Sequence, residues 1–297
     1  MKLGYACINM SLGKSVTTNR AMIKRTFDAR GLDYVSELAL ANASDIIKIL
    51  QWNVKHDIRF FRLSSAIIPW GDKIDITTLK YYPQICGMLR KAGDYAKANN
   101  IRITSHPGPF VVLTSPNESV IQNSIKDLEL HGKIFDLMGL DRSPYNKINI
   151  HCNGVYGDKT SAMDRFCTNF ERLSESVRSR LTVENDDKAS MYSVSDLMYI
   201  HNRIGIPIVF DYHHHKFCTG DLSEQSALAL AISTWPVGIT PVVHYSESRP
   251  DGKPQAHSDY ISVLPFTYGY DFDIMLECKQ KELALLRVRN SLKCTLV

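Results

Sequence analysis

Short hydrophobic segments recur along the chain, and each is bounded by glycine, proline, asparagine or aspartate. They are rich in β-branched and aromatic residues, which is typical of buried strands in a parallel sheet. Eight segments have this character. They span residues 3–9, 59–65, 101–106, 147–153, 180–186, 206–212, 240–246 and 273–278. We predict that each of them forms a strand.

Each predicted strand is followed by a longer segment, and the clearest of these repeat their hydrophobic residues every three or four positions, the period of a helix. These clearest helical segments are 44–56, 80–100, 117–140, 223–235 and 279–292. Eight alternations of strand and helix predict parallel βαβ units that close into a (β/α)8 TIM barrel. We expect one such domain over residues 1–297, with an open doubly wound sheet as the alternative.

Composition places the chain among ordinary globular proteins, with 44% hydrophobic and 22% charged residues. The formal net charge of +4 permits nucleic-acid binding without requiring it. Seven cysteines without a C-x-x-C pair indicate free thiols in a reducing compartment. No apolar run approaches the ~20 residues of a membrane span, and the start of the chain lacks the pattern of a secretory leader. We therefore expect an intracellular protein, and a monomer because no heptad or large apolar stripe requires a partner.

Residues of metal-binding type stand at the ends of six successive predicted strands. They are His106, His151, Glu184, Asp211, His244 and Glu277. In a barrel the carboxyl ends of the strands meet on one face, where active sites gather. A single such residue is usually a turn or capping residue, but six at the spacing of one βα unit predict a metal centre. Imidazole and carboxylate ligands without thiolate suit zinc, manganese or iron.

Further ligands are expected from the loops beside this face. Residues 213–215 are three histidines after the sixth strand, of which only one or two can point inward. His257 and Asp259 lie in the loop after the seventh strand, within reach of the same face. Strand alternation turns Cys152 and Cys278 away from the centre.

The same alternation predicts the layer of side chains below the centre, two residues before each strand-end residue. Apart from one asparagine these are small or apolar, as a packed layer requires. The layer consists of Thr104, Asn149, Thr182, Val209, Val242 and Met275. Three other histidines, His56, His131 and His201, lie in helical segments and are expected on the solvated surface.

So many ligands can hold more than one divalent cation, and paired cations clamp the attacking and leaving oxygens of a phosphoryl displacement. Glu184 and Glu277 are the expected bridging, catalytic carboxylates, with metal-activated hydroxide as the nucleophile and no covalent protein intermediate. The sequence lacks G-x-x-x-x-G-K-[ST], G-x-G-x-x-G and G-x-S-x-G motifs. We therefore expect neither a nucleotide cofactor nor a serine nucleophile.

Seven segments, taken in order, resemble the UV damage endonucleases. They are LGYACIN, RLSSAIIP, SHPG, HCNGVYGDK, LTVENDDK, FDYHHH and DIMLECKQKE, and the resemblance runs from residue 3 to about residue 287. It implies a TIM barrel related in architecture to endonuclease IV, with two or three divalent cations, manganese first and zinc as the alternative. It also implies that damaged double-stranded DNA is nicked immediately 5′ to UV photoproducts, leaving a 3′-hydroxyl.

The resemblance also implies roles for individual residues. The implied ligands are His106, His151, Glu184, Asp211, His214, His244, His257 and Glu277. His214 is thereby chosen from the histidine triplet. Tyr5 and Asn9 fall on the family's first-strand motif and are implied to face the lesion strand near the scissile phosphate, with ordinary barrel packing as the alternative.

Three regions depart from the family's pattern. Pro109 and Phe110 replace a glutamine and a tyrosine that probe the damaged bases, although Phe110 retains a ring that can wedge into a duplex. Val242 stands where the family often has a lysine that can be carboxylated near the metals. Residues 71–73 replace the region where a further ligand histidine is usual. These departures bear on lesion preference and on the number and affinity of the metals.

Other functions remain compatible with the residues. The same metal barrel suits an abasic-site endonuclease or a sugar isomerase or epimerase, and a damaged-DNA-binding protein without turnover is a non-catalytic alternative. Five basic residues near the strand ends are expected either to contact phosphates or to act as solubilising surface charge. They are Arg62, Lys73, Lys159, Lys188 and Lys216.

Overall fold

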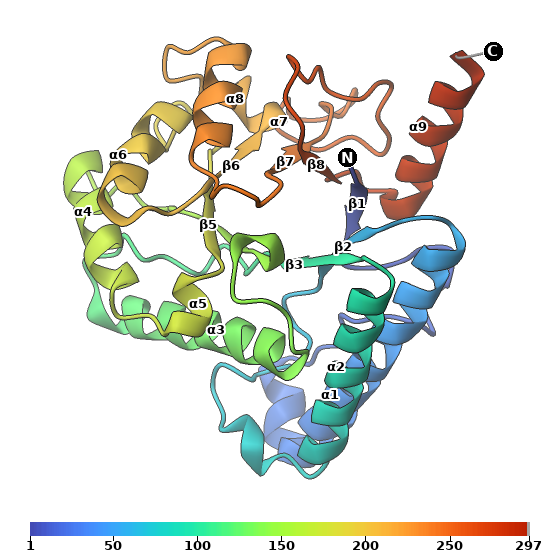
Figure 1. Ribbon diagram of the computed structural model, residues 1–297. Coiled ribbons are helices and arrows are strands. Elements are labelled where there is room, and N and C mark those ends of the chain that lie inside the picture. The colour runs from blue at the N-terminus through green and yellow to red at the C-terminus, as the bar shows by residue number, and fades with distance from the viewer. Residues whose placement is uncertain (296–297) are drawn as a thin grey trace.

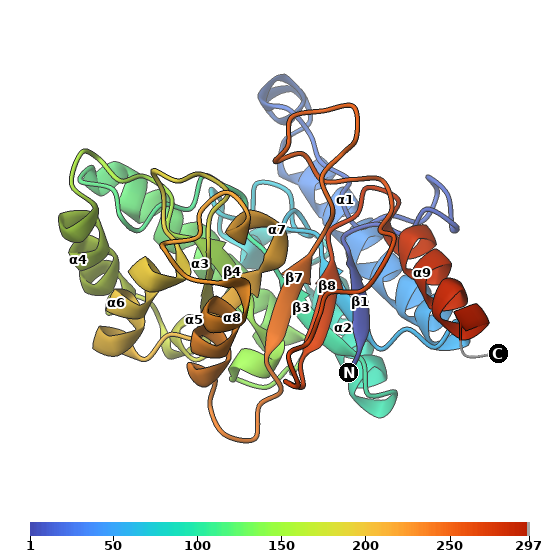
Figure 2. The ribbon, with the colours of Figure 1, turned by 90° about the horizontal axis from the view of Figure 1, so that it is seen from above.

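A computed structural model describes residues 1–295, with side chains through residue 291 (Figures 1 and 2). Eight parallel strands pair in chain order, and the last pairs with the first, so the sheet closes into a barrel. The strands are β1 (Leu3–Ala6), β2 (Phe60–Leu63), β3 (Arg102–Ser105), β4 (Ile148–His151), β5 (Leu181–Glu184), β6 (Ile208–Asp211), β7 (Val242–Tyr245) and β8 (Asp273–Leu276). Each lies inside a predicted segment. The TIM barrel is confirmed, and the open sheet is excluded.

Helices pack around the outside of the barrel (Figure 1). They are α1 (Lys24–Lys55), α2 (Tyr82–Ala98), α3 (Glu118–Leu137), α4 (Lys159–Phe170), α5 (Glu175–Arg178), α6 (Val194–Ile204), α7 (Tyr212–His215), α8 (Glu224–Ser233) and α9 (Lys281–Thr295), with the short 3-10 turns η1 (Ile76–Thr78) and η2 (Pro144–Asn146). The five clearest helical segments of the sequence are all found. None of these helices is long and apolar enough to cross a membrane, within the residues described.

Two helical features differ from the sequence prediction. α1 begins at Lys24, well before the periodic stretch at 44–56, and it kinks at Gly31, whose φ of 61° and ψ of −158° are not helical. The prediction that every strand is followed by a helix is wrong for β7, because residues 246–272 run to β8 as an irregular connection. This connection contains Pro250, Pro254 and Pro265, which interrupt helical hydrogen bonding.

The barrel has an inner and an outer apolar cluster. The inner one contains Val209, Val242 and Met275, which confirms the predicted inward direction of these three side chains. The outer cluster lies between strands and helices and includes buried Cys152 and Cys278, as strand alternation predicts. The cysteines with described side chains are free thiols, whereas the side chain of Cys294 lies outside the described residues.

An ion pair closes the amino end of the barrel. Arg102 begins β3 and is fully buried, and its Nη1 lies 3.0 Å from Oδ2 of Asp273, which begins β8. The same guanidinium donates to the backbone carbonyls of Tyr145 and Thr240. This pair joins two strands that are far apart in the sequence, and it lies at the end of the barrel opposite the predicted metal centre.

Strand register brings the predicted ligands together at the carboxyl end. β4 and β5 pair with His151 beside Glu184, and β6 and β7 pair with Asp211 beside His244. Asp211 also caps α7, because its Oδ1 accepts the backbone N–H of His214 at 2.8 Å. The cap turns the chain sharply after β6 and brings His214 next to the strand end.

Candidate metal centre

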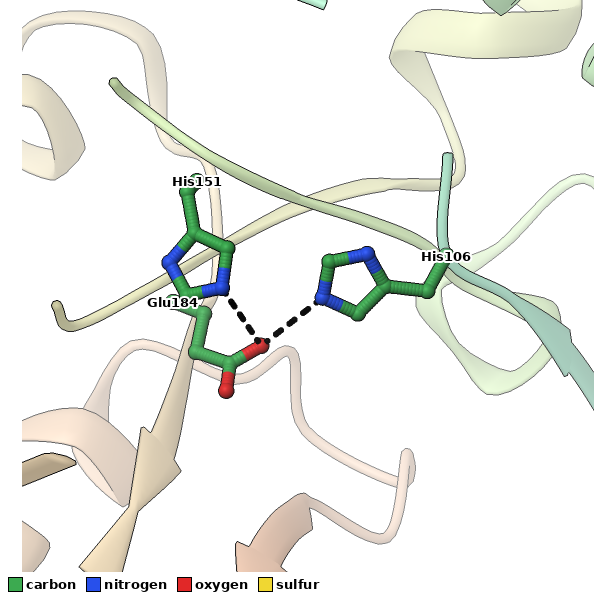
Figure 3. A group of neighbouring side chains, drawn as sticks. All are labelled: His106, His151 and Glu184. Atoms are coloured by element: carbon green, nitrogen blue, oxygen red, sulfur yellow. Dashed lines mark hydrogen bonds and ion pairs between the residues drawn. The ribbon is translucent and has the colours of Figure 1, made fainter. Parts of the chain in front are cut away.

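The strand-end side chains converge on Glu184, which ends β5 and is fully buried. Its Oε2 lies 3.2 Å from Nε2 of His106 and 3.8 Å from Nε2 of His151 (Figure 3). Its Oε1 lies 3.0 Å from Nδ1 of His244 and 3.5 Å from Nδ1 of His214. One carboxylate therefore faces imidazoles at the carboxyl ends of β3, β4, β6 and β7.

Three overlapping groups of ligands share this carboxylate. In each group, one ligand atom from every residue lies within 4.8 Å of the others. The groups are His106–His151–Glu184, Glu184–His244–Glu277 and Glu184–Asp211–His214. A carboxylate has two oxygens and can bind a different cation with each. The geometry therefore suits adjacent cations joined through Glu184.

Electrostatics prepare these groups to bind cations. Burial works against the charge on Glu184, but His244 and His151 hold its pKa well below the usual range. Burial lowers the pKa of His106 to about 4, so at neutral pH its imidazole is uncharged and has a free lone pair. His151 is also buried, but Glu184 and Asp186 outweigh that burial and raise its pKa to about 9. A cation that binds His151 must therefore displace a proton.

Asp211 supplies an independent test of whether a cation fits. Its Oδ2 is buried and has no hydrogen-bond partner, and burial raises the pKa of this carboxyl group. A buried oxygen without a partner is costly, and a bound cation would satisfy it. The donor set of imidazole and carboxylate, without thiolate, suits zinc, manganese or iron. The residues present therefore fit divalent cations.

The histidine triplet contributes one side chain to the centre. His214 lies against Glu184 and Asp211. His213 places Nε2 3.1 Å from the carbonyl oxygen of Gln255, and His215 packs its ring against Phe210. This agrees with the expectation that not all three histidines point inward.

A layer of polar side chains beneath the ligands includes one that the sequence analysis missed. Asn149 donates to Oε2 of Glu184 and accepts from Oγ1 of Thr182, as their predicted inward direction allows. Lys147, directly before β4, is fully buried one step deeper, and its Nζ lies 3.1 Å from Nε2 of His244. Burial lowers the pKa of this lysine well below its usual range. Continuing the alternation from residue 151 through 149 to 147 would have identified it.

The centre opens through a cavity of about 260 Å³. This entrance cavity is lined by Arg62, His106, Pro107, Gly108, Pro109, His151, Asn153 and Glu277. Ligands of the metal centre therefore form part of a surface that a substrate can reach.

Comparison with known proteins places this chain in a family. The sequence profile of the family described as UV-endonuclease UvdE matches residues 1–295. The chain belongs to this family. It is 36% identical over 303 residues to the UV DNA damage endonuclease of Clostridium perfringens (strain 13 / Type A), covering 99% of this chain and 71% of that protein. It is 35% identical to the UV DNA damage endonuclease of Bacillus cereus (strain G9842), and the match covers 98% of this chain and 94% of that protein.

Solved structures agree with this membership. The crystal structure of SacUVDE is 34% identical and superposes with a TM-score of 0.88 over 99% of this chain and 98% of that one. D-Psicose 3-epimerase from Clostridium cellulolyticum H10 superposes with a TM-score of 0.55 at 12% identity, over 94% of this chain and 85% of that one. The second likeness shows a shared barrel fold and nothing about the reaction.

His257 lies at the edge of the centre. Its Nε2 is 4.0 Å from Oε2 of Glu277, and its ring centroid is 5.9 Å from that of His214. It is not part of the three overlapping groups. Asp259 lies in the same connection, and its backbone carbonyl accepts a hydrogen bond from the backbone N–H of Gln280.

The two first-strand residues of the UvdE motif are buried. Tyr5 has no exposed surface, and its hydroxyl donates to Asn53 on α1 at 2.7 Å. Asn9 donates to that hydroxyl at 2.8 Å and accepts the backbone N–H of Leu12. Tyr5 therefore packs between β1 and α1 and Asn9 is buried beside it, neither lines the entrance cavity, and their contact with the lesion strand stays a prediction.

Pro109 and Phe110, the two residues expected to meet the damaged bases, are exposed. Pro109 lines the entrance cavity, and 88% of Phe110 is open to solvent in the loop after β3. This loop is anchored, because Asn153 donates to the carbonyl of Val111 at 2.9 Å. A large ring therefore projects from a fixed loop beside the metal centre.

The remaining histidines and lysines have other surroundings. The prediction that His131 lies on the surface is wrong: only 3% of it is exposed, because α3 turns this side against the barrel. His56 and His201 are half-buried. Of the basic residues, Lys73 pairs with Asp72, Lys159 pairs with Asp196, and Arg62 pairs with Glu277, whereas Lys188 and Lys216 are exposed.

Proposed function

We propose that this protein is a UV DNA damage endonuclease that hydrolyses the phosphodiester immediately 5′ to a UV photoproduct and leaves a 3′-hydroxyl. Membership of the UvdE family and the names of its relatives support the reaction class. The structural observation that carries the proposal is Glu184, a buried carboxylate shared by three ligand groups beside an open cavity. Such a centre suits hydrolysis of a phosphodiester.

The proposed cofactor is a cluster of two or three divalent cations, with manganese first and zinc as the alternative. The three groups around Glu184 supply seven of the proposed ligands, and His257 at the rim is the eighth. Bound cations would supply Lewis acidity and lower the pKa of water. The protein itself favours charged carboxylates here despite burial: His244 and His151 lower the pKa of Glu184, and Arg62 followed by His244 lowers the pKa of Glu277.

The proposed partner is damaged double-stranded DNA. The ring of Phe110 projects beside the entrance cavity and can wedge between bases, and a photodimer weakens the stacking that such a wedge must disrupt. One chain supplies every ligand of the three groups, so the proposed active form is a monomer that acts inside the cell, on DNA.

A nicking assay tests this proposal. Purified protein with manganese is incubated with supercoiled plasmid that is intact, UV-irradiated or depurinated to create abasic sites. We expect relaxation of the irradiated plasmid, and ends that a polymerase extends directly because they carry a 3′-hydroxyl. Relaxation of the depurinated plasmid alone would support the abasic-site alternative. Irradiated plasmid that stays supercoiled, although the protein contains manganese, would contradict the proposal.

A further inference from the structure

Arg62 on β2 is a positive charge at the metal centre that the ligand set does not explain. Its Nη1 donates to Oε1 of Glu277, and the two side chains expose only 13% and 14% of their surface. Because Phe60, two residues earlier, belongs to the inner apolar cluster, Arg62 points into the barrel from the same face of the strand. The pair sits at the carboxyl end of the barrel, beside His106 and His151.

The pairing with Glu277 leaves most of the guanidinium unused. Arginine carries five N–H donors in a planar fork, and here only Nη1 donates to an acceptor among the described residues. The Nε atom is buried and has no hydrogen-bond partner. Leaving a buried donor unpaired is unfavourable, so its persistence points to an acceptor that is brought by a ligand.

The entrance cavity indicates where that acceptor lies. Among the described residues that line it, Arg62 is the sole lysine or arginine, and it lies next to His106, His151 and Glu277. A phosphodiester that reaches the centre through this cavity brings its non-bridging oxygens to the same place. A guanidinium fork matches phosphate oxygens better than any other side chain does.

We propose that Arg62 is a catalytic residue that binds a non-bridging oxygen of the scissile phosphate while its Nη1 stays on Glu277. The residue connects a metal-ligand carboxylate to the reacting group. Attack on the phosphorus adds negative charge to these oxygens, so a fixed guanidinium stabilises the transition state more than the ground state. It is placed on a strand of the barrel, and it therefore needs little reorganisation during the reaction. This inference rests on the proposed phosphodiester hydrolysis.

The test compares the wild-type protein with Arg62→Met, Arg62→Lys and a control, Arg203→Met. Arg203 is an exposed arginine on α6 that pairs with Asp164 and does not line the entrance cavity. The substrate is a short duplex with one thymine dimer, used under single-turnover conditions with manganese. Manganese content is measured for every variant by mass spectrometry, and duplex affinity by fluorescence anisotropy.

We expect Arg62→Met to cut at least about 100-fold more slowly, as for loss of one preorganised donor to a developing oxyanion. Its manganese content should equal that of the wild type, and its affinity for the duplex should change by no more than about threefold, because many phosphate contacts contribute to binding. Arg62→Lys keeps a positive charge beside Glu277 but lacks the guanidinium fork. This variant should hold manganese and cut at a rate between those of the wild type and Arg62→Met. The control should match the wild type.

A sulfur substitution separates contact with phosphate from support of Glu277. Replacing the contacted non-bridging oxygen by sulfur should slow the wild type more than Arg62→Met, since the variant has already lost that contact. Wild-type rates in Arg62→Met, or a loss of rate that follows loss of manganese in both variants, would overturn the proposal. Failure of the wild type itself to cut the thymine-dimer duplex would overturn the proposed function, and this inference with it.

Discussion

His151 makes the stability of the metal-free protein depend on pH. Burial opposes protonation of this side chain, but Glu184 and Asp186 raise its pKa from 6.5 to about 9. Because the folded state binds this proton more tightly than the unfolded chain does, the stabilisation is complete below pH 6.5 and is lost as the pH rises through 9. A shift from 6.5 to about 9 corresponds to about 3 kcal/mol.

Thermal unfolding of chelator-treated protein measures this effect. For a chain of 297 residues, about 3 kcal/mol corresponds to a fall of about 5 °C in the melting temperature. Between pH 6 and 9.5, the melting temperature of the wild type should fall by about 5 °C more than that of His151→Asn. His201→Asn, which removes a half-buried histidine on α6, should follow the wild type. Equal pH dependence in wild type and His151→Asn would refute the reasoning.

Manganese should reverse the sign of this dependence. A proton and a cation compete for the same imidazole, so a rising pH removes the competitor and tightens metal binding. The loaded protein should therefore keep or gain stability over the range in which the metal-free protein loses it. If the manganese-loaded protein loses as much thermal stability over this pH range as the metal-free protein, His151 does not bind the metal.

Three further outcomes follow from individual residues. Glu184→Gln should abolish nicking of irradiated plasmid in the relaxation assay, yet leave affinity for irradiated duplex within about threefold, because phosphate contacts dominate binding; full activity would rule out a bridging carboxylate. Phe110→Ala should lower selectivity for irradiated over intact duplex by about tenfold in a competition assay, the value of one stacked base, and unchanged selectivity would mean that the ring has no contact with DNA. Arg102→Met leaves the buried Asp273 without its ion-pair partner and should lower the free energy of unfolding, measured with denaturant, by about 3–5 kcal/mol. Arg203→Met should lower it by less than about 1 kcal/mol, and equal losses would refute this role of the buried pair.

Much of the fold was predictable because parallel strands carry a strong local signal. Every strand of the barrel is buried on both faces, so each appears in the sequence as a compact apolar run between turn residues. The convergence of the candidate ligands was predictable for the same reason, since the end of a run fixes the position of residues such as Glu184 and Glu277. The selection of His214 from its triplet came from the family resemblance and agrees with the cap made by Asp211.

The misses depend on surroundings that lie far away in the sequence. Nothing near His131 shows that α3 turns this side against the barrel. Tyr5 lies in a short apolar segment, and nothing near it in the sequence shows that Asn53 on a distant helix accepts its hydroxyl proton. Lys147 was overlooked because a lysine at the start of a predicted strand normally points to solvent, whereas here it is buried and its Nζ lies 3.1 Å from Nε2 of His244. The irregular connection after β7 was missed because its prolines were not weighed against the repeating pattern.

Closure of the barrel by β1 and β8 has a consequence for biogenesis. During synthesis the group of His106, His151 and Glu184 is complete once the first five strands have left the ribosome. The group that contains Glu277 has to wait for the last strand, whose pairing with β1 also seals the ring. Full loading of the proposed metal centre would therefore require that the chain has been finished and its ring closed. A prematurely terminated product retains a partial set of ligands, but lacks the carboxylate that would complete the centre.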